Sequence, residues 1–574
     1  MSRISRKRLW VGGISVASAL TVTAGITAAA PAAEQAAPDT DIRLIAASPS
    51  VTLERYKGEG GVPDGVFLNL GTYLSVKGTP LEFRAERANY RKPIAVQQII
   101  REGGEVRTKD LPKDLVKDFM GLPDFTRVTL TDASGRKVVS KKEAFCPNNA
   151  SGRTDPGAPR TSRYPEGCSP HPFTLGSVWG VEQGWASNTY LDYYTTPVDV
   201  PDGVYTAKIS VTKKYRDFLG IANEPQTVEV TVRTLGEPPE AEARSAAKGA
   251  NADHADHAGG HGGHGGHAEQ GPAKGMGPKQ LRGDSTEITP PPALPYALMK
   301  TGRAAVATSG DGPGRTDGSR VSPPMKPAAE RPSGRAGLPA DAPKPDLRAL
   351  PAWDIGIDPA REGEPAGRDH LAFASTTWNA GPAPLVVDGF RKPGKGLMDA
   401  YQYFYDAKGE QIGYAPSGTM EWDPRDDHMH WHFTDFAAYQ LLKADKKEVV
   451  RSDKEAFCLA SNAAVDYTVK DANWHPTSTD LSTACASGEP EALSVRQALE
   501  IGSGDTYPSA FAGQSFDITD VPNGTYWIKV VANPQKRLHE TSLDNNTALR
   551  KVVLGGEPGA RTVQVPAHGL VTSR

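Results

Sequence analysis

Three histidines occupy alternate positions in the segment 427–433: His428, His430 and His432. In an extended strand successive side chains point to opposite faces, so the three imidazoles would share one face. The large apolar residues of the segment would share the other face and pack against the protein: Met429, Trp431 and Phe433. Imidazole binds copper, zinc, iron and nickel alike, so the triplet predicts a metal site without choosing the metal.

The geometry of a strand restricts how this triplet can bind one ion. At about 3.4 Å per residue, the Cα atoms of His428 and His432 lie roughly 13 Å apart in a flat strand. We therefore expect a twist or a bulge in this strand, which would bring the imidazoles together.

The N-terminal segment from Met1 to Ala33 has the features of a secretory signal peptide. Four basic residues precede an apolar run, and small residues follow it. Removal of this segment takes the formal net charge from -3 to -7, because it carries four positive charges and no acidic residue. No other segment is long and apolar enough to span a membrane, and no basic footprint for nucleic acid is visible. We expect a secreted protein without a membrane span in its mature form.

The chain has four cysteines, and the residues before two of them repeat. Ser140-Lys-Lys-Glu-Ala-Phe-Cys146 is similar to Ser452-Asp-Lys-Glu-Ala-Phe-Cys458, and a further cysteine follows each motif. In an exported chain this arrangement predicts two disulfides, Cys146–Cys168 and Cys458–Cys485.

An internal repeat organises the rest of the chain. The segments 199–211 and 520–532 are also alike, each a turn that leads into an alternating strand. We place the two units at residues 41–235 and 346–556, followed by a tail at 557–574. Apolar residues alternate in both units, and helical patterns are scarce. The predicted fold is all-β, with two tandem β-sandwich-like domains joined by a long linker.

Residues 236–345 are rich in Pro, Gly, Ala and charged residues and poor in aromatic residues. They cannot bury enough apolar surface to order themselves, so we expect a disordered linker. Five of its histidines lie among glycines and aspartates: His254, His257, His261, His264 and His267. This tract could hold divalent metal weakly or serve as a soluble spacer, and the sequence leaves both open.

The two units differ at the histidine segment. Counted back from the shared cysteine, the three histidines fall opposite Val116, Asp118 and Met120 of the first unit. Histidines needed for the scaffold should occur in both copies. Their confinement to the second unit therefore favours a chemical role for them over a structural one. The same comparison cautions against assigning a role to Lys454, because Lys142 occupies its place in the unit without the triplet.

Several motifs follow one another in the second unit. After the triplet come Lys454-Glu-Ala-Phe-Cys458, Asp505-Thr-Tyr507 and Phe516-Asp-Ile-Thr-Asp-Val521. This ordered set resembles the catalytic domain of the lysyl oxidases over most of residues 350–556, and the resemblance is much fainter in the first unit. It implies a copper amine oxidase whose lysine tyrosylquinone cofactor forms from a lysine and a tyrosine of the protein itself.

Carried over position by position, the resemblance implies copper ligands at His428, His430 and His432, a crosslinking lysine at Lys454 and a quinone-forming tyrosine at Tyr507. The implied reaction converts a primary amine, such as a protein lysine, and molecular oxygen into an aldehyde, ammonia and hydrogen peroxide. The quinone does the electronic work. An uncharged Lys454 must add to the oxidised ring, so this lysine has to be partly desolvated.

Two departures from the family pattern stand out. A histidine that follows the metal strand in the family is Ala438 here, which leaves the general base open among Asp435, Asp505 and Asp517. In addition, this unit keeps a single pair of cysteines, whereas animal lysyl oxidases carry several more disulfides in this domain.

Other functions fit part of the pattern. A non-catalytic extracellular copper-binding or copper-sequestering protein would use the triplet together with the histidine-rich tract. A hydrolytic zinc site needs three protein ligands and an open position, but no suitably placed glutamate stands out. We interpret the first unit as a degenerate copy without the metal site that serves as a docking or substrate-presenting module.

Overall fold

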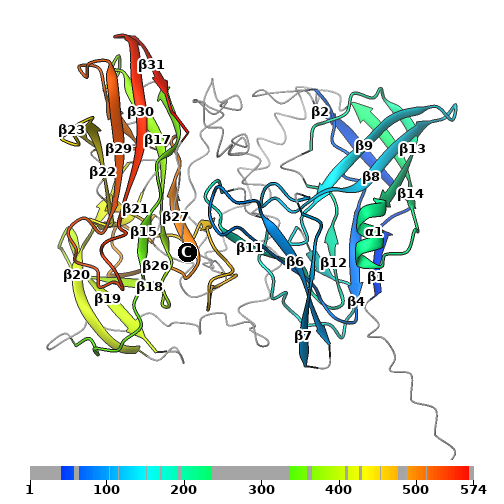
Figure 1. Ribbon diagram of the computed structural model, residues 1–574, viewed down its shortest axis with the longest axis horizontal. Coiled ribbons are helices and arrows are strands. Elements are labelled where there is room, and N and C mark those ends of the chain that lie inside the picture. The colour runs from blue at the N-terminus through cyan, green and yellow to red at the C-terminus, as the bar shows by residue number, and fades with distance from the viewer. Residues whose placement is uncertain are drawn as a thin grey trace, which may run out of the picture. The chain divides into compact units, whose positions relative to one another are not determined.

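The structure is a computed structural model in which strands make up nearly all of the regular secondary structure (Figure 1). It describes residues 41–567 apart from 57–63, 103, 114, 150, 169–170, 192–194, 235–336, 359–364, 407–410, 426–428, 453, 455, 476–484, 487 and 512. The predicted signal peptide, the linker up to residue 336 with its histidine tract, and His428 therefore lie outside the described residues. The prediction of an all-β, two-domain fold is confirmed.

The strands of residues 41–234 form three sheets. In the order of hydrogen-bonded neighbours, the first contains β1 (Asp41–Ala46), β4 (Thr72–Lys77), β12 (Trp185–Asn188) and β10 (Ser151–Arg153). The second contains β11 (Gly176–Val181), β5 (Leu81–Glu86), β6 (Ala95–Glu102) and β7 (Glu105–Asp110). The third contains β3 (Gly65–Val66), β2 (Ser50–Tyr56), β14 (Gln226–Thr234), β13 (Gly203–Val211), β8 (Leu122–Asp132) and β9 (Lys137–Phe145).

The strands from residue 347 onwards also form three sheets. The first contains β15 (Leu347–Ala349), β17 (His370–Asn379), β27 (Ser503–Tyr507) and β25 (Ala463–Ala464), and β17 also pairs with β16 (Trp353–Asp358) and β28 (Ser515–Asp517). The second contains β24 (Ala456–Phe457), β21 (His430–Thr434), β20 (Gln411–Asp423), β19 (Leu397–Tyr405), β18 (Leu385–Arg391) and β26 (Ser494–Leu499). The third contains β23 (Glu448–Arg451), β22 (Ala437–Lys443), β29 (Gly524–Ala532), β30 (Thr547–Glu557) and β31 (Ala560–Gln564), so it continues into the segment that we assigned to the tail.

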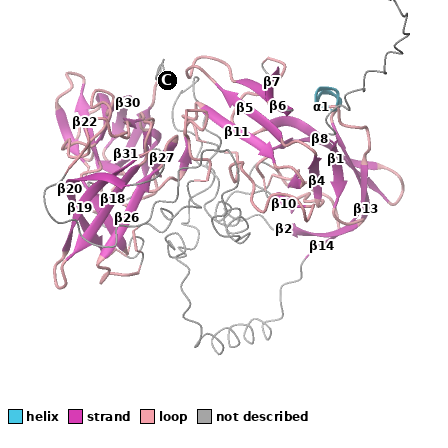
Figure 2. Ribbon diagram, turned by 90° about the horizontal axis from the view of Figure 1, so that it is seen from below, coloured by secondary structure: helices cyan, strands magenta, loops and turns pink. Residues whose placement is uncertain are grey.

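The described residues contain one α-helix, α1 (Lys213–Leu219), which is the cyan element in Figure 2. It follows β13 and ends at Gly220, whose φ of +70° is the left-handed conformation that commonly terminates helices. No helix within the described ranges has the length and apolarity that a membrane crossing requires.

The order of strands recurs between the two halves. The order β11-β5-β6-β7 in the first half corresponds to β26-β18-β19-β20 in the second, and β9-β8-β13-β14 corresponds to β23-β22-β29-β30. A tyrosine closes the turn before β13 and before β29: the Tyr205 hydroxyl donates to the Pro201 carbonyl and the Tyr526 hydroxyl to the Pro522 carbonyl, each at 2.7 Å. These correspondences support the predicted repeat; its domain boundaries stay predictions.

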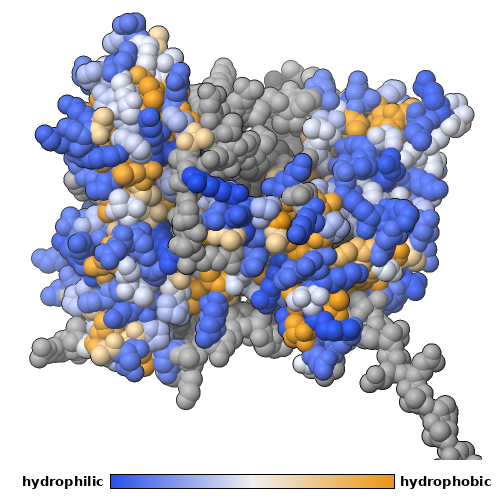
Figure 3. All heavy atoms as spheres, in the orientation of Figure 1, coloured by the Kyte–Doolittle hydropathy of each residue, from blue (hydrophilic) through white to orange (hydrophobic). Residues whose placement is uncertain are grey.

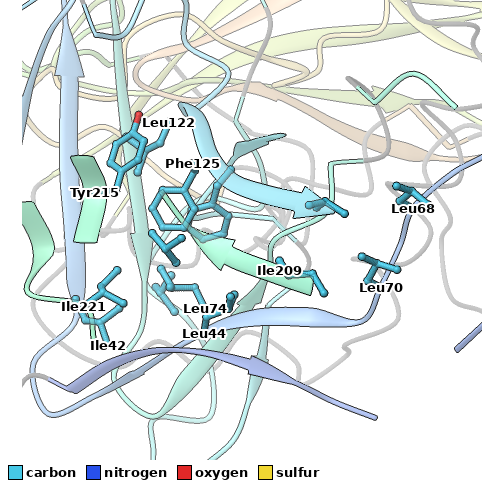
Figure 4. Packing of buried hydrophobic residues seen from close by; sticks show 14 of the residues in the cluster. Ile42, Leu44, Leu68, Leu70, Leu74, Leu122, Phe125, Ile209, Tyr215 and Ile221 are labelled. Atoms are coloured by element: carbon cyan, nitrogen blue, oxygen red, sulfur yellow. The ribbon is translucent and has the colours of Figure 1, made fainter. Parts of the chain in front are cut away.

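Each half has its own apolar core. Figure 4 shows part of the first, where Leu44, Leu74 and Phe125 pack near Ile209 and Tyr215. The second core includes side chains from the strands that carry the predicted site: Trp431, Phe433, Phe457, Tyr507 and Phe516. Polar side chains cover much of the face shown in Figure 3, as expected for a chain in which 23% of residues are charged. The predicted site is therefore built directly on the core of the second half.

Candidate functional site

Strand β21 carries two of the three histidines. Its Trp431 and Phe433 are buried in the core, so alternation along the strand places His430 and His432 together on the opposite face. The Nε2 atoms of these two imidazoles are 2.8 Å apart. Two of the three predicted ligands therefore converge; the third, His428, lies outside the described residues.

The backbone departs from a regular strand immediately before His430. Met429 has a φ of +35°, which is unusual for a residue with a side chain. Its side chain is 44% exposed, so the prediction that it packs on the core face with Trp431 and Phe433 is wrong. The physical reason is that the strand begins only at His430, and strict alternation does not extend back to residue 429.

A buried carboxylate supports the histidine pair from the neighbouring strand. Asp423 on β20 lies opposite His430 in the register of the two strands, and its Oδ2 atom is 3.4 Å from Nδ1 of His432. The Arg425 guanidinium donates to Asp423 at 2.9 Å. A carboxylate that accepts the Nδ1 proton of a histidine leaves Nε2 free to bind a metal. Within the described ranges no cluster of three or more metal-binding side chains occurs, as expected with His428 excluded.

The sequence analysis missed Asp423 and Arg425. Both precede the triplet in the chain, and nothing in their local pattern distinguishes them from other charged residues near a turn. Only the antiparallel register of β20 and β21 brings Asp423 to the histidine pair.

Lys454 lies in the interior between β23 and β24. It is 4% exposed, and its Nζ atom has no hydrogen-bond partner among the described residues. Nζ lies 4.8 Å from the ring centroid of Tyr507 and 5.3 Å from that of Phe457. The predicted crosslinking lysine and the predicted quinone-forming tyrosine are thus neighbours in the folded protein.

Local contacts fix the backbone of Lys454. The Ser452 hydroxyl accepts from the Lys454 N–H at 3.2 Å and donates to the Gly513 carbonyl at 2.6 Å. Gly513 has a φ of +76°, and a Cβ atom there would lie 3.0 Å from Cβ of Lys454. Only glycine combines this conformation with so close an approach. The backbone at Gly513 therefore lies directly against the stem of the Lys454 side chain.

Burial changes the protonation of this lysine. Desolvation, with a smaller effect of the Arg425 charge, lowers the pKa of Lys454 to about 8, although Asp423 and Asp505 oppose the shift. Asp423 therefore acts on both His432 and Lys454, and links the two parts of the site. A substantial fraction of free amine exists only a little above neutral pH, as a nucleophilic lysine requires.

Tyr507 ends strand β27 with its hydroxyl inside the protein. The hydroxyl donates to the Cys458 carbonyl at 2.9 Å, and the ring packs edge-on against Phe457 with a centroid distance of 5.0 Å. Burial, followed by the charges of Asp505 and Tyr439, raises the pKa of Tyr507 well above its ordinary value. In this state the side chain is a neutral phenol held in one orientation.

Asp505 lies two residues before Tyr507 on β27, so both side chains are on the same face of the strand. It is 2% exposed; Oδ1 accepts from Asn462 at 3.3 Å, and Oδ2 has no hydrogen-bond partner among the described residues. Burial raises the pKa of Asp505 well above its usual value, and the Lys454 charge opposes this.

The other two candidate bases have different surroundings. Asp435 forms an ion pair with Arg537 at 2.9 Å, and Asp517 forms one with Arg368 at 2.7 Å. Burial raises the pKa of Asp517, but hydrogen bonds from Thr519 and Arg368 outweigh it, and the net pKa is lowered. Of the three carboxyl groups, only Asp505 acts electrostatically on both Lys454 and Tyr507.

The chain is similar to known proteins in its C-terminal part. Residues 407–561 match the family model described as lysyl oxidase. Lysyl oxidase homolog 2 of Xenopus tropicalis is 30% identical over 139 residues, which are 24% of this chain and 16% of that protein. Lysyl oxidase homolog 4 of Homo sapiens is 32% identical over 132 residues, which are 23% of this chain and 15% of that protein.

The similarity is local to this part of the chain. The matched stretch spans only about a sixth of the length of these relatives, at 16% and 15%. A solved structure of a tetra-tandem repeat in the extending region of a large adhesion protein covers 92% of this chain and 99% of its own, but its TM-score of 0.08 and 8% identity carry no argument. The family-model match contains the histidine strand, Lys454, Asp505 and Tyr507, so the similarity to the lysyl oxidase family extends over the whole candidate site.

Proposed function

We propose that this protein is a secreted, copper-dependent amine oxidase. It oxidises primary amines, including lysine side chains of proteins or peptides, to aldehydes and releases ammonia and hydrogen peroxide. The observation that carries the proposal is the Nζ atom of Lys454, which is buried 4.8 Å from the ring centroid of Tyr507 and has no hydrogen-bond partner in the part of the chain that the structure describes. A buried lysine without a partner is costly, so its presence beside a phenol calls for a function.

The histidine pair fits a copper ion. Metal–nitrogen distances for imidazole are about 2.0 Å, so two Nε2 atoms 2.8 Å apart can both contact one ion. Imidazole ligands in a tetragonal arrangement suit Cu(II). His430 and His432 would hold the ion with His428 as third ligand, and Asp423 would orient His432.

The neighbouring side chains fit a lysine tyrosylquinone. When present, this group supplies an electrophilic carbonyl for the substrate amine and accepts two electrons. The chain would contribute an amine with a pKa of about 8 at Lys454, a ring fixed by the Cys458 carbonyl at Tyr507, and an apolar wall at Phe457 that excludes water. Secretion fits the signal-like N-terminus and the two disulfides, whose Cα atoms are 5.9 Å and 5.8 Å apart.

Purified protein loaded with copper in air tests the proposal. Peptide mapping should find Lys454 and Tyr507 joined, and an alkyl amine should give peroxide. Tyr507→Phe should abolish the crosslink and the peroxide while copper remains bound. Tyr526→Phe is the matched control, because it removes the same kind of hydroxyl-to-carbonyl hydrogen bond outside the site.

Two results would separate the competing functions. Copper-loaded protein without crosslink or turnover, and with several coppers per chain, would overturn the proposal in favour of copper sequestration. Zinc in protein purified without added metal, together with no quinone absorbance, would favour a hydrolytic site instead.

A further inference from the structure

Amine oxidation needs a group that removes a proton from the carbon next to the amine nitrogen. Such a base has to lie beside the reacting ring, and its pKa should be near the working pH. The side chain at position 438, in β22, is an alanine and cannot supply it. The base must therefore come from another residue near Tyr507.

The geometry of β27 provides one carboxyl group in this position. Asp505 and Tyr507 share one face of the strand, and Asp505 is buried beside the ring that the substrate must reach. Its Oδ1 atom is held by Asn462 at 3.3 Å, whereas Oδ2 has no hydrogen-bond partner within the described part of the chain. One oxygen is thus oriented by Asn462, and the other, also buried, has a lone pair that no described group uses.

The rival carboxyl groups are ion-paired with arginines. Their side chains are 26% exposed at Asp435 and 32% exposed at Asp517. An arginine partner stabilises the carboxylate and weakens it as a base. Among the described residues Asp505 has no arginine partner, and the charge that acts on it is that of Lys454.

We propose that Asp505 is the general base of the amine oxidase reaction, which removes the α proton of the bound amine. This inference rests on the proposed function. In this step the α proton would move to Oδ2 of Asp505, and the quinone, when present, would accept the electron pair of the C–H bond. Overall, water would supply the oxygen of the aldehyde, the amine nitrogen would leave as ammonia, and molecular oxygen would take two electrons and two protons to give hydrogen peroxide.

The charged and titratable groups around Asp505 are compatible with its role as a base. Lys454 faces it from the segment between β23 and β24, Tyr439 from β22, and Tyr507 from its own strand. Burial raises the pKa of both tyrosines, so both are neutral near pH 7. When the Lys454 nitrogen becomes part of the cofactor, its positive charge no longer favours the Asp505 carboxylate. The acid form of Asp505 then persists to a higher pH, because the charge that lowers its pKa is gone.

The experiment compares Asp505→Asn and Asp505→Glu with Asp435→Asn and Asp517→Asn, all loaded with copper in air. The first readout is independent of turnover: the mass of the Lys454–Tyr507 crosslinked peptide and the titration of the quinone with phenylhydrazine. The second is the anaerobic bleaching of the quinone by an alkyl amine with hydrogen or deuterium at the α carbon. The third is the pH dependence of kcat/KM.

The amount of crosslinked quinone in Asp505→Asn should be within about twofold of the wild-type amount. Its quinone should be bleached by the alkyl amine about 10²–10⁴-fold more slowly than that of the wild type. Asp505→Glu should recover part of the bleaching rate, with a changed deuterium isotope effect. The acidic limb of the kcat/KM profile should disappear in Asp505→Asn, and both rival variants should match the wild type.

Bleaching of Asp505→Asn within fivefold of the wild type would overturn the assignment. So would loss of the crosslink in both Asp505 variants, because Asp505 would then serve cofactor assembly, or a large loss in Asp435→Asn or Asp517→Asn. Absence of quinone in the wild type would instead refute the proposed function, which distinguishes the two failures.

Discussion

The two lysines of the repeated Lys-Glu-Ala-Phe-Cys motif have opposite environments. The Lys142 side chain, on β9, is 42% exposed and forms an ion pair with Asp124 at 3.0 Å. Lys454 is 4% exposed, has no hydrogen-bond partner at Nζ among the described residues, and has a pKa lowered to about 8. The same motif thus includes a disulfide cysteine in both halves, whereas burial lowers the pKa of the lysine in the second half.

A second difference between the halves lies at one edge of a sheet. In the first half the second sheet ends at β7, whose six residues are all exposed. In the second half the corresponding strand, β20, pairs with β21, which in turn pairs with β24. Strand β21 carries His430 and His432, and β24 contains Phe457 of the repeated motif, whose ring centroid lies 5.3 Å from Nζ of Lys454. Among the described strands β21 has no counterpart beside β7, and it supplies the histidines of the proposed site.

The largest expected effect comes from exchanging each motif lysine for arginine. Lys454→Arg keeps a positive charge, but a guanidinium does not lose its proton and cannot attack a quinone ring. We expect no crosslinked peptide and no peroxide from this variant, and wild-type amounts of both from Lys142→Arg. Crosslinking in Lys454→Arg through another lysine would refute the difference that we assign to the two positions.

Separate removal of each disulfide distinguishes its contribution to the stability of the fold from its contribution to forming the site. They close loops with sequence separations of 22 and 27, so each should contribute about 3 kcal/mol to the free energy of unfolding. The second also holds the site, because the Cys458 carbonyl accepts from Tyr507 and the Cys485 carbonyl accepts from the Trp431 N–H at 2.8 Å.

Paired Cys-to-Ser variants should therefore lose similar stability in urea unfolding, but only the Cys458/Cys485 pair should lose quinone. Equal losses of quinone in both variants would contradict the assignment.

Lys454→Met should stabilise the protein before the crosslink forms. The pKa of Lys454 falls from 10.5 to about 8 on folding, which corresponds to a cost of roughly 3 kcal/mol below pH 8, where both folded and unfolded states are protonated. The cost fades as the pH rises from 8 to 10.5, because the folded state loses its proton first. Unfolding of copper-free wild type and variant at pH 7 and pH 10 checks this: the advantage of Lys454→Met should shrink at the higher pH.

The exposed counterpart provides the control for this titration. Lys142→Met removes a surface ion pair, which is worth about 0.2–1 kcal/mol. It should change stability slightly and in the opposite direction. An equal stabilisation by both substitutions would show that burial does not distinguish the two lysines.

The fold class and the main features of the site could be predicted from sequence because they depend on local patterns. Alternating apolar residues predict strands, paired cysteines in an exported chain predict disulfides, and histidines at alternate positions predict a shared face. His430 and His432 confirm that shared face, since both depend only on the period of one strand. The structure also brings Lys454 to Tyr507, although their roles stay predictions.

Features that depend on pairing between distant segments could not be predicted. Asp423 reaches His432 through the register of a hairpin, and Asp505 differs from Asp435 and Asp517 only in burial and in the absence of an arginine partner. The exposure of Met429 depends on where the strand begins, and sequence periodicity defines element ends poorly. Tertiary contacts, which the periodicity of one segment does not encode, determine all three features.

A further small effect is expected for a feature that the two halves share. Tyr205 and Tyr526 are buried, and each hydroxyl donates to the carbonyl of the proline four residues earlier at 2.7 Å. Tyr205→Phe and Tyr526→Phe should each lower the free energy of unfolding by about 1 kcal/mol, measured in urea, because one hydrogen bond is lost and its carbonyl is left unpaired. Neither should change the amount of Lys454–Tyr507 crosslink. A loss of crosslink in Tyr526→Phe alone would mean that the turn before β29 also positions the site, so that even the shared scaffold differs between the halves.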